Sequence, residues 1–210
     1  MTSKLKQASN ISPNVIQETC ERLTDLFGEP PVVIGGRAVN IYCFHERRDT
    51  HDIDVAVKQD PSEIPNFFYK AVEMGFIPRT EDEKAGGKMV GVTDRETGAQ
   101  VDFFFKETIG GVEKSDVFEM ALDRTLTKRG TTKVVDPGLL VLMKYTANRD
   151  KDWEDVGNLM RNVYGNSPSV FLKEESEKVK KYVPADQQKL FVQNLISATK
   201  APFTSELRTS

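Results

Sequence analysis

The sequence predicts an α+β fold, with a small mixed sheet flanked by helices and a helical part that follows it. Segment 52–55 alternates polar and apolar residues, which is the period of a half-buried strand, and segment 100–105 is a largely apolar run that indicates a second strand. From Asp136 onward, apolar residues recur instead at helical spacing. We therefore expect a sheet-containing domain at residues 12–135 and a helical domain at residues 136–205.

The composition is typical of a globular protein in a reducing compartment. Hydrophobic residues make up 38% of the 210 residues, and this length is enough for one sizeable core or two small ones. The net charge of −3 gives no overall basic field, but it does not exclude a local basic groove. The polar start lacks a signal-peptide core, and no apolar run approaches the about 20 residues of a membrane span. We expect a cytoplasmic protein whose isolated cysteines, Cys20 and Cys43, are buried thiols.

The first expected helix begins at Ser12 and ends before Gly28. Serine caps a helix by accepting a backbone hydrogen bond, and Pro13 suits the first helical position. The apolar residues at helical spacing are Ile16, Cys20, Leu23 and Phe27. This face indicates packing against a sheet.

The stretch from Pro31 to Val55 organises the rest of the chain. A short apolar strand at 32–34 runs into the pair Gly35-Gly36, where an amphipathic helix follows. Backbone N–H groups at such a turn bind phosphate. After the helix, Asp52 and Asp54 share one face of a strand, because successive side chains alternate. Two adjacent carboxylates favour a hard cation between them, and Mg²⁺ is the usual choice.

Further strands and one helix are expected between residues 60 and 105. Asp60 and Pro61 form a helix start, and Gly75 ends that helix. Strands follow at 76–78 and 89–93, and Gly98 takes the left-handed position of a hairpin connection to the strand at 100–105. Segment 117–128 is ambiguous between a helix and the first strand of a hairpin around 129–130. The small basic tip of this hairpin suits a solvated loop or contact with an acidic or nucleic-acid substrate.

Asp102 lies inside the apolar strand at 100–105. A buried unpaired carboxylate is costly, so this acid needs a partner. A metal shared with Asp52 and Asp54 is one explanation, and a salt bridge to a nearby Lys or Arg is the other. With a metal, Asp102 is also a candidate general base for an acceptor hydroxyl.

The C-terminal part begins with a capped helix at Asp136-Pro137, which carries Lys144. Asp150, Asp152 and Asp155 then open a second helix. Acids favour helix N-termini, and Lys151 with Asp155 has the spacing of an i,i+4 pair, so a purely structural role is open. Another amphipathic helix is expected at 185–199. The lysines of the segment 173–181 suit a solvated face or contact with a polyanion; they include Lys178, Lys180 and Lys181.

Gly35-Gly36 followed by Arg48-x-Thr50-x-Asp52-Ile53-Asp54 resembles the signature of the polymerase-β-like nucleotidyltransferase superfamily. The branch that it resembles contains aminoglycoside nucleotidyltransferases and abortive-infection-type toxin nucleotidyltransferases. The resemblance spans roughly residues 32–159, and it includes Lys144 and the later Arg149-Asp150-Lys151-Asp152 run. The commonest form of the signature has Gly-Ser. With Gly36 in place of serine, backbone amides and Arg37 would have to contribute more to phosphate binding.

The resemblance implies three metal ligands, namely Asp52, Asp54 and Asp102. It also implies a nucleotide site, which would contain Gly35, Gly36, Arg37, Arg48, Thr50 and Lys144. Arg149, Lys151 and Asp152 would lie around this site or on its acceptor side. Two alternatives stay open: Arg48 pairs on the surface with Glu46 or Asp49, and His51 packs rather than ligates.

The expected activity is metal-dependent transfer of a nucleoside monophosphate from an NTP, such as ATP, with release of pyrophosphate. Two Mg²⁺ ions are expected, with Mn²⁺ as an alternative. The sequence does not identify the acceptor, which could be an RNA end, a protein or a small hydroxylated molecule. Two other hypotheses remain: a non-catalytic protein that binds a nucleotide or partner, and the toxin of a toxin–antitoxin pair. Neither the oligomeric state nor the partner can be read from the chain, and no membrane contact is expected.

Overall fold

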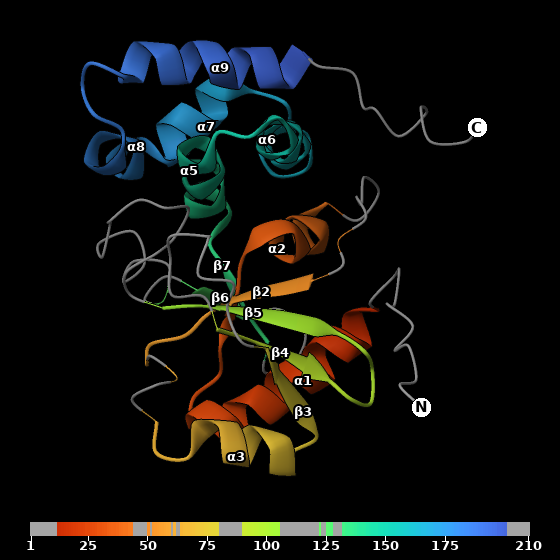
Figure 1. Cartoon of the computed structure of the whole chain (residues 1–210). Helices are drawn as coiled ribbons and strands as arrows, with labels where there is room; N and C mark the ends of the chain where they lie inside the picture. Colours follow the sequence, from red (N-terminus) through yellow and green to blue (C-terminus); the bar gives the residue numbers. More distant parts are fainter. Residues whose placement is uncertain are drawn as a thin grey trace. The chain divides into compact units, whose positions relative to one another are not determined.

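The computed structural model describes residues 12–43, 50, 52–59, 61, 64–79, 90–105, 122, 125–127 and 132–200. The chain divides into two compact units (Figure 1). The first unit, residues 1–37 and 49–135, contains the sheet. The second unit, residues 38–48 and 136–210, contains the C-terminal helices. The predicted α+β class is confirmed, whereas the predicted roles of the two domains stay predictions.

The sheet has seven strands among the described residues, in the order β3-β4-β5-β2-β1-β7-β6. The β2–β5 and β1–β7 pairs are parallel and the other pairs are antiparallel, so this is the mixed sheet that the sequence predicts. The strands are β1 (Val32–Val33), β2 (Asp52–Ala56), β3 (Phe76–Arg79), β4 (Val90–Asp94), β5 (Gln100–Phe104), β6 (Thr125–Thr127) and β7 (Lys133–Val135).

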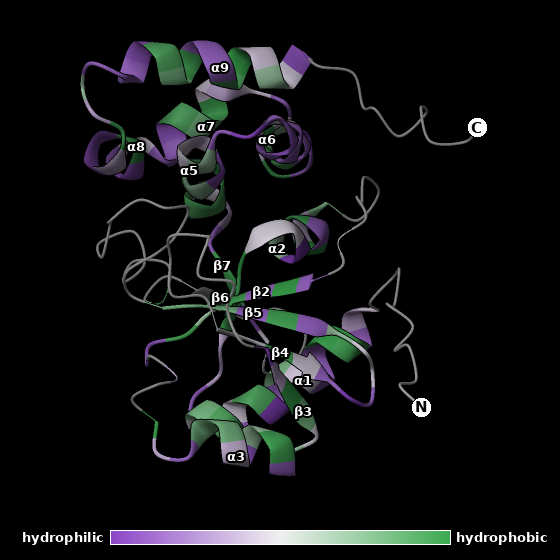
Figure 2. Cartoon of the chain, in the orientation of Figure 1, coloured by the Kyte–Doolittle hydropathy of each residue, from purple (hydrophilic) through white to green (hydrophobic). Residues whose placement is uncertain are grey.

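The pairing of β2 with β5 places the predicted acids in one row. Asp54 lies opposite Asp102 in the parallel register. Ile53 and Val55 are fully buried, while Asp52 and Asp54 on the other face are partly exposed. This confirms the alternation predicted for β2; Figure 2 shows the hydropathy of the residues along this strand.

Helices α1 (Pro13–Phe27) and α3 (Phe67–Glu73) pack against the face of the sheet that carries Phe103. The Phe27 ring meets the Phe103 ring edge to face, with 5.1 Å between centroids, and Phe67 contacts both rings. Because Asp102 precedes Phe103 on the strand, its side chain points to the opposite face. The acids therefore lie on the face that α1 and α3 do not cover.

The predicted ends of α1 are confirmed. The Ser12 side chain accepts a hydrogen bond from the backbone N–H of Val15, at 3.3 Å. Gly28 ends the helix at φ 76°, and its N–H donates to the carbonyl of Thr24. Gly98 likewise has a positive φ in the connection between β4 and β5, as the hairpin signal predicts.

The helix that was predicted to end at Gly75 does not run unbroken through the described residues before it. The helix α3 begins only at Phe67, directly after Asn66, whose φ of 57° lies in the left-handed region. Pro65 has no N–H to donate, and a left-handed residue cannot continue a right-handed helix. Asp60 itself lies outside the described residues, as does the tip of the hairpin between β6 and β7.

The second unit consists of helices in its described part. They are α5 (Pro137–Ala147), α6 (Asp150–Val163), α7 (Pro168–Glu174), α8 (Ser176–Tyr182), α9 (Gln188–Lys200) and most of α2 (Gly35–Tyr42). Asp136 caps α5 by accepting a hydrogen bond from the N–H of Leu139, as predicted. Among the described helices, none has the length and apolar character needed to cross a membrane.

Lys178 departs from the expected solvated face. Its ammonium group is buried and forms ion pairs with Asp136, at 2.6 Å, and with Glu175, at 2.5 Å. Glu175 also accepts a hydrogen bond from the buried hydroxyl of Tyr164. This lysine therefore connects the start of α5 to α8 instead of facing solvent.

Candidate active site

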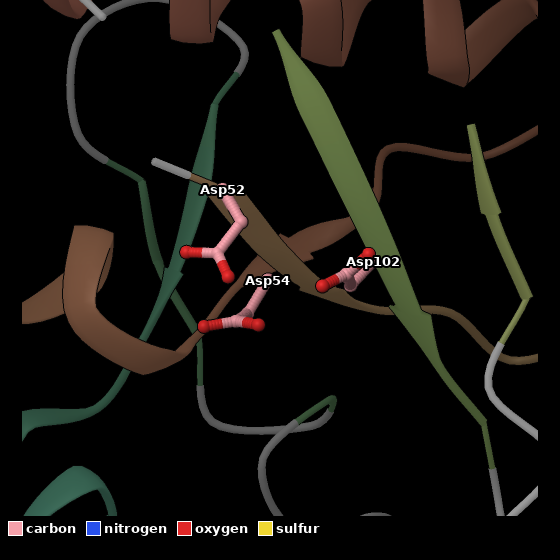
Figure 3. Close-up of side chains that lie close together, drawn as sticks. All are labelled: Asp52, Asp54 and Asp102. Carbon is pink, nitrogen blue, oxygen red and sulfur yellow. The ribbon is translucent and has the colours of Figure 1, made fainter. Parts of the chain in front are cut away.

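Three carboxylates meet on one face of the sheet. Asp52 and Asp54 come from β2, and Asp102 comes from the neighbouring β5 (Figure 3). Each offers one oxygen such that all three oxygens lie within 4.8 Å of one another. Three hard oxygen donors at this separation fit a divalent cation of the Mg²⁺ class. The identity of the ion is not fixed by this geometry.

Asp102 is the most enclosed of the three acids. Its residue is 7% exposed, and its Oδ1 atom is buried without a hydrogen-bond partner. Burial raises the pKa of Asp102 above its ordinary value, the guanidinium of Arg79 opposes this rise, and the carboxylate of Asp52 adds to it. A buried carboxylate beside two further acids is an arrangement that a bound cation would stabilise.

Both sequence-based explanations of Asp102 have support in the structure. Besides the acidic cluster, Nη1 of Arg79 forms an ion pair with Oδ1 of Asp102 at 2.8 Å, outside hydrogen-bonding geometry. A carboxylate has two oxygens, and Figure 3 shows one oxygen of Asp102 directed toward Asp52 and Asp54. The salt bridge and a cation site are therefore compatible.

Gly35 lies directly against Asp54. A Cβ atom at position 35 would fall 1.8 Å from Oδ2 of Asp54, and the glycine has a φ of 64°. Only glycine allows the turn after β1 to approach the acid this closely, since it has no Cβ and adopts positive φ without strain. The predicted phosphate-binding turn is thus adjacent to the acidic cluster.

Arg37 is buried in the first turn of α2. Its Nε donates to the carbonyl of Asp52 at 3.3 Å, and its Nη2 donates to the carbonyl of Thr50. These bonds hold the chain that enters β2, and so they position Asp52. Direct contact between Arg37 and a nucleotide stays a prediction.

Thr50 is 5% exposed, and its Oγ1 has no hydrogen-bond partner within the described part of the chain. This residue precedes Asp52 by two positions. Its predicted place beside a nucleotide stays a prediction. Arg48 and His51 lie outside the described residues.

Lys144 belongs to the second unit, where it is buried between two acids. Its Nζ lies 3.0 Å from Oδ1 of Asp152 and 2.7 Å from Oδ2 of Asp155. Arg149 also binds Asp152, at 2.6 Å, while Lys151 is exposed. Asp155 is thus held in the interior by Lys144, rather than serving only as a surface acid. The predicted nucleotide contacts of Lys144, Arg149, Lys151 and Asp152 stay predictions.

Arg79 is a residue of the site that the sequence did not reveal. It lies on β3, more than twenty residues before Asp102, in a segment with no motif. Its ion pair with Asp102 depends on the register in which β3, β4 and β5 pair, and this register cannot be predicted from the sequences of such short strands. The sequence indicated only that Asp102 could form a salt bridge with a nearby Lys or Arg, and it did not identify which residue this is.

Comparisons with known proteins identify the family of this chain and a structure that shares its fold. The family model described as "Nucleotidyl transferase of unknown function (DUF2204)" matches residues 15–197. A structure of an antigenic nucleotidyltransferase-like protein from Paracoccidioides brasiliensis is similar, with a TM-score of 0.50 and 15% identity, over 88% of this chain and 94% of that chain. At this identity the likeness shows a shared fold.

The Megavirus polyadenylate synthase is 13% identical over 79% of this chain and 35% of its own, with a TM-score of 0.49, too weak to support an argument. The comparison with curated protein sequences finds no match. The resemblance to the nucleotidyltransferase superfamily is nevertheless confirmed, because the family model covers most of the chain. The chain therefore belongs to the family of nucleotidyl transferases of unknown function.

Proposed function

We propose that this protein transfers a nucleoside monophosphate from an NTP to a hydroxyl or phosphate acceptor, in a reaction that requires Mg²⁺ and releases pyrophosphate. Family membership supports nucleotidyl transfer as the reaction class. The observation that carries the finer proposal is the cluster of Asp52, Asp54 and Asp102, whose oxygens lie within 4.8 Å of one another.

Asp52, Asp54 and Asp102 would hold Mg²⁺, or Mn²⁺ in its place, with two ions expected. When bound, such ions neutralise the charge that develops on the transferred phosphoryl group. The short distances between the three carboxylate oxygens and the all-carboxylate donor set support this assignment.

The triphosphate would bind at the Gly35-Gly36 turn, in which Gly35 lies directly against Asp54 and whose backbone N–H groups would contact phosphate. Thr50, Arg48 and Lys144 complete the proposed nucleotide contacts. Arg37 would act through the main chain of Thr50 and Asp52, which it holds.

In the proposed step, an acceptor oxygen forms a bond to the α-phosphorus of the NTP. The bond from this phosphorus to the bridging oxygen breaks, and pyrophosphate leaves with the electron pair. Asp102 accepts the proton of the acceptor hydroxyl, a role that its place beside Asp54 in the register allows. The acceptor classes considered are an RNA end, a protein and a small hydroxylated molecule.

The test is transfer of label from each α-³²P-labelled NTP to pools of RNA, protein and small hydroxylated molecules, with and without Mg²⁺. The Asp54→Asn variant should lose transfer by at least about a hundredfold, because it removes one charge from the cation site. Asp25→Asn is the matched control, since Asp25 is an exposed acid on α1. Transfer that persists in Asp54→Asn would contradict the proposal. Nucleotide binding without transfer by the wild type would favour a non-catalytic binding protein.

A further inference from the structure

Arg79 reaches the acidic cluster from the edge of the sheet. It pairs with Gly91 of β4, Gly91 pairs with Asp102 of β5, and Asp102 pairs with Asp54 of β2. Residues directly opposite one another on neighbouring strands point to the same face of a sheet. One row therefore runs from Arg79 across Gly91 to the two acids.

Gly91 leaves the space that this crossing needs. A Cβ at position 91 would lie 3.2 Å from Cζ of Arg79 and 3.1 Å from Oδ1 of Asp102. Both contacts are tighter than an ordinary van der Waals contact. The guanidinium of Arg79 therefore lies over the glycine of β4, where it forms its 2.8 Å ion pair with Asp102.

With respect to the described residues, the Arg79 side chain keeps donors for a further partner. A guanidinium has five N–H donors and stays charged at all ordinary pH values. The contacts that the described residues make with it involve Nη1, which faces Asp102 at 2.8 Å and Gln100 at 3.5 Å. The side chain is 33% exposed, so an anion from solvent can reach it.

The position of Arg79 relative to Gly35 indicates which substrate it would meet. Gly35 lies against Asp54, whereas Arg79 lies against Asp102, so the two residues flank the acids on opposite sides. In an in-line displacement, the leaving group and the attacking group are on opposite sides of the phosphorus. If pyrophosphate leaves at the glycine turn, the attacking hydroxyl enters on the side of Arg79.

We propose, on the basis of the proposed function, that Arg79 binds the acceptor and selects one that carries a phosphate near its attacking hydroxyl. A guanidinium forms paired, charge-assisted hydrogen bonds with phosphate oxygens. The positive charge of the guanidinium also repels a cationic acceptor, such as a sugar that carries several amino groups. The 3′ end of an RNA has the required chemistry, because its last ribose hydroxyls neighbour a phosphodiester.

The first test measures binding, which does not depend on turnover. A ten-nucleotide oligoribonucleotide with a free 3′ hydroxyl is titrated into wild type, Arg79→Ala, Arg79→Lys and Arg95→Ala, with Mg²⁺ present. Arg79→Ala should weaken binding about tenfold, which equals about 1.4 kcal/mol, and should reduce the salt slope of the binding constant by about 0.7. Arg79→Lys should recover part of the affinity. Arg95→Ala should match wild type, since Arg95 is exposed at the other end of β4.

The second test compares three acceptors under Mg²⁺ with labelled NTP: the same oligoribonucleotide, a nucleoside 5′-monophosphate and the cationic sugar kanamycin. Label on either phosphate-bearing acceptor would support the proposal, provided that Arg79→Ala raises the KM for that acceptor at least about tenfold and leaves the KM for NTP unchanged. The labelled molecule would also show whether the acceptor is an RNA end or a mononucleotide. Label on kanamycin alone, or equal oligoribonucleotide binding by wild type and Arg79→Ala, would overturn it.

The two proposals fail in different ways. Mg²⁺-dependent NTP binding without Arg79-dependent oligoribonucleotide binding would leave the proposed function and remove the role of Arg79. Arg79-dependent oligoribonucleotide binding without any nucleotide binding or transfer would remove the proposed function and support anion binding at Arg79.

Discussion

Gly28 and Gly35 have similar positive φ values, 76° and 64°, but very different surroundings. No atom lies within 4 Å of the position where a Cβ of residue 28 would be, whereas a Cβ at residue 35 would overlap with the carboxylate of Asp54. Substitutions at these two glycines therefore distinguish the free-energy cost of an unfavourable backbone conformation, which both share, from the effect of displacing Asp54, which only position 35 has.

We predict that Gly28→Ala and Gly35→Ala each lower the free energy of unfolding by at least about 1 kcal/mol, the cost of a left-handed alanine. Only Gly35→Ala should also lose Mg²⁺ binding and nucleotidyl transfer, because its methyl group must push Asp54 away. Urea unfolding and calorimetric Mg²⁺ titration measure the two effects. Unchanged Mg²⁺ affinity in Gly35→Ala would show that the close approach of Gly35 to Asp54 does not matter for the site.

At the scale of elements, helices α5 and α6 are joined by buried charges. Lys144 of α5 contacts Asp152 and Asp155 of α6, and all three residues are at most 5% exposed. Burial by itself would raise the pKa of Asp152. Hydrogen bonds from Arg149 and the charge of Lys144 outweigh burial, so the pKa of Asp152 lies below its ordinary value.

A lowered pKa in the folded state means that the ionised carboxylate stabilises the fold. This contribution is fully present above the unfolded-state pKa of about 3.9 and is lost as the pH falls through the folded-state value. We predict that Asp152→Asn loses about 3 kcal/mol of stability near pH 7, because Lys144 then lacks one partner. The variant should lose less stability than wild type on acidification below about pH 4.

Urea unfolding near pH 7 and near pH 3 measures this difference. Asp150→Asn is the control, since Asp150 is exposed at the first residue of α6. An equal loss of stability on acidification in Asp152→Asn and wild type would mean that Asp152 does not contribute to acid sensitivity.

For the molecule as a whole, the division into two units predicts where a bound cation acts. All three candidate ligands belong to the sheet unit. A ligand present at a hundred times its Kd stabilises the folded state by about 2.7 kcal/mol. Mg²⁺ should therefore slow amide exchange in β2 and β5, while exchange in α7 and α8 stays unchanged.

Hydrogen exchange followed by mass spectrometry, with and without Mg²⁺, makes this comparison. The Asp102→Asn variant should show little protection at the same Mg²⁺ concentration, because one ligand is missing. Protection confined to the helical unit would contradict the assignment of the cation site to Asp52, Asp54 and Asp102.

Local patterns in the chain were sufficient to predict several elements. The caps at Ser12 and Asp136, the positive φ at Gly98 and the alternation around Asp52 and Asp54 all depend on residues within a few positions of one another. Neighbouring residues set such features through sterics and backbone hydrogen bonds, so the sequence alone determined them. It also determined the α+β class and the resemblance to nucleotidyltransferases.

Other features depended on contacts between residues that are distant in the chain. The ion pair of Arg79 with Asp102 depends on the register of three strands, and the burial of Lys178 depends on the packing of α8 against the start of α5. The start of α3 at Phe67 is a local exception, because the left-handed Asn66 interrupts the helix that was expected to reach Gly75 without a break. Only the tertiary structure decided which basic side chain faces the acidic cluster. Strand register and helix packing are set by the whole core, so they cannot be read from a single segment.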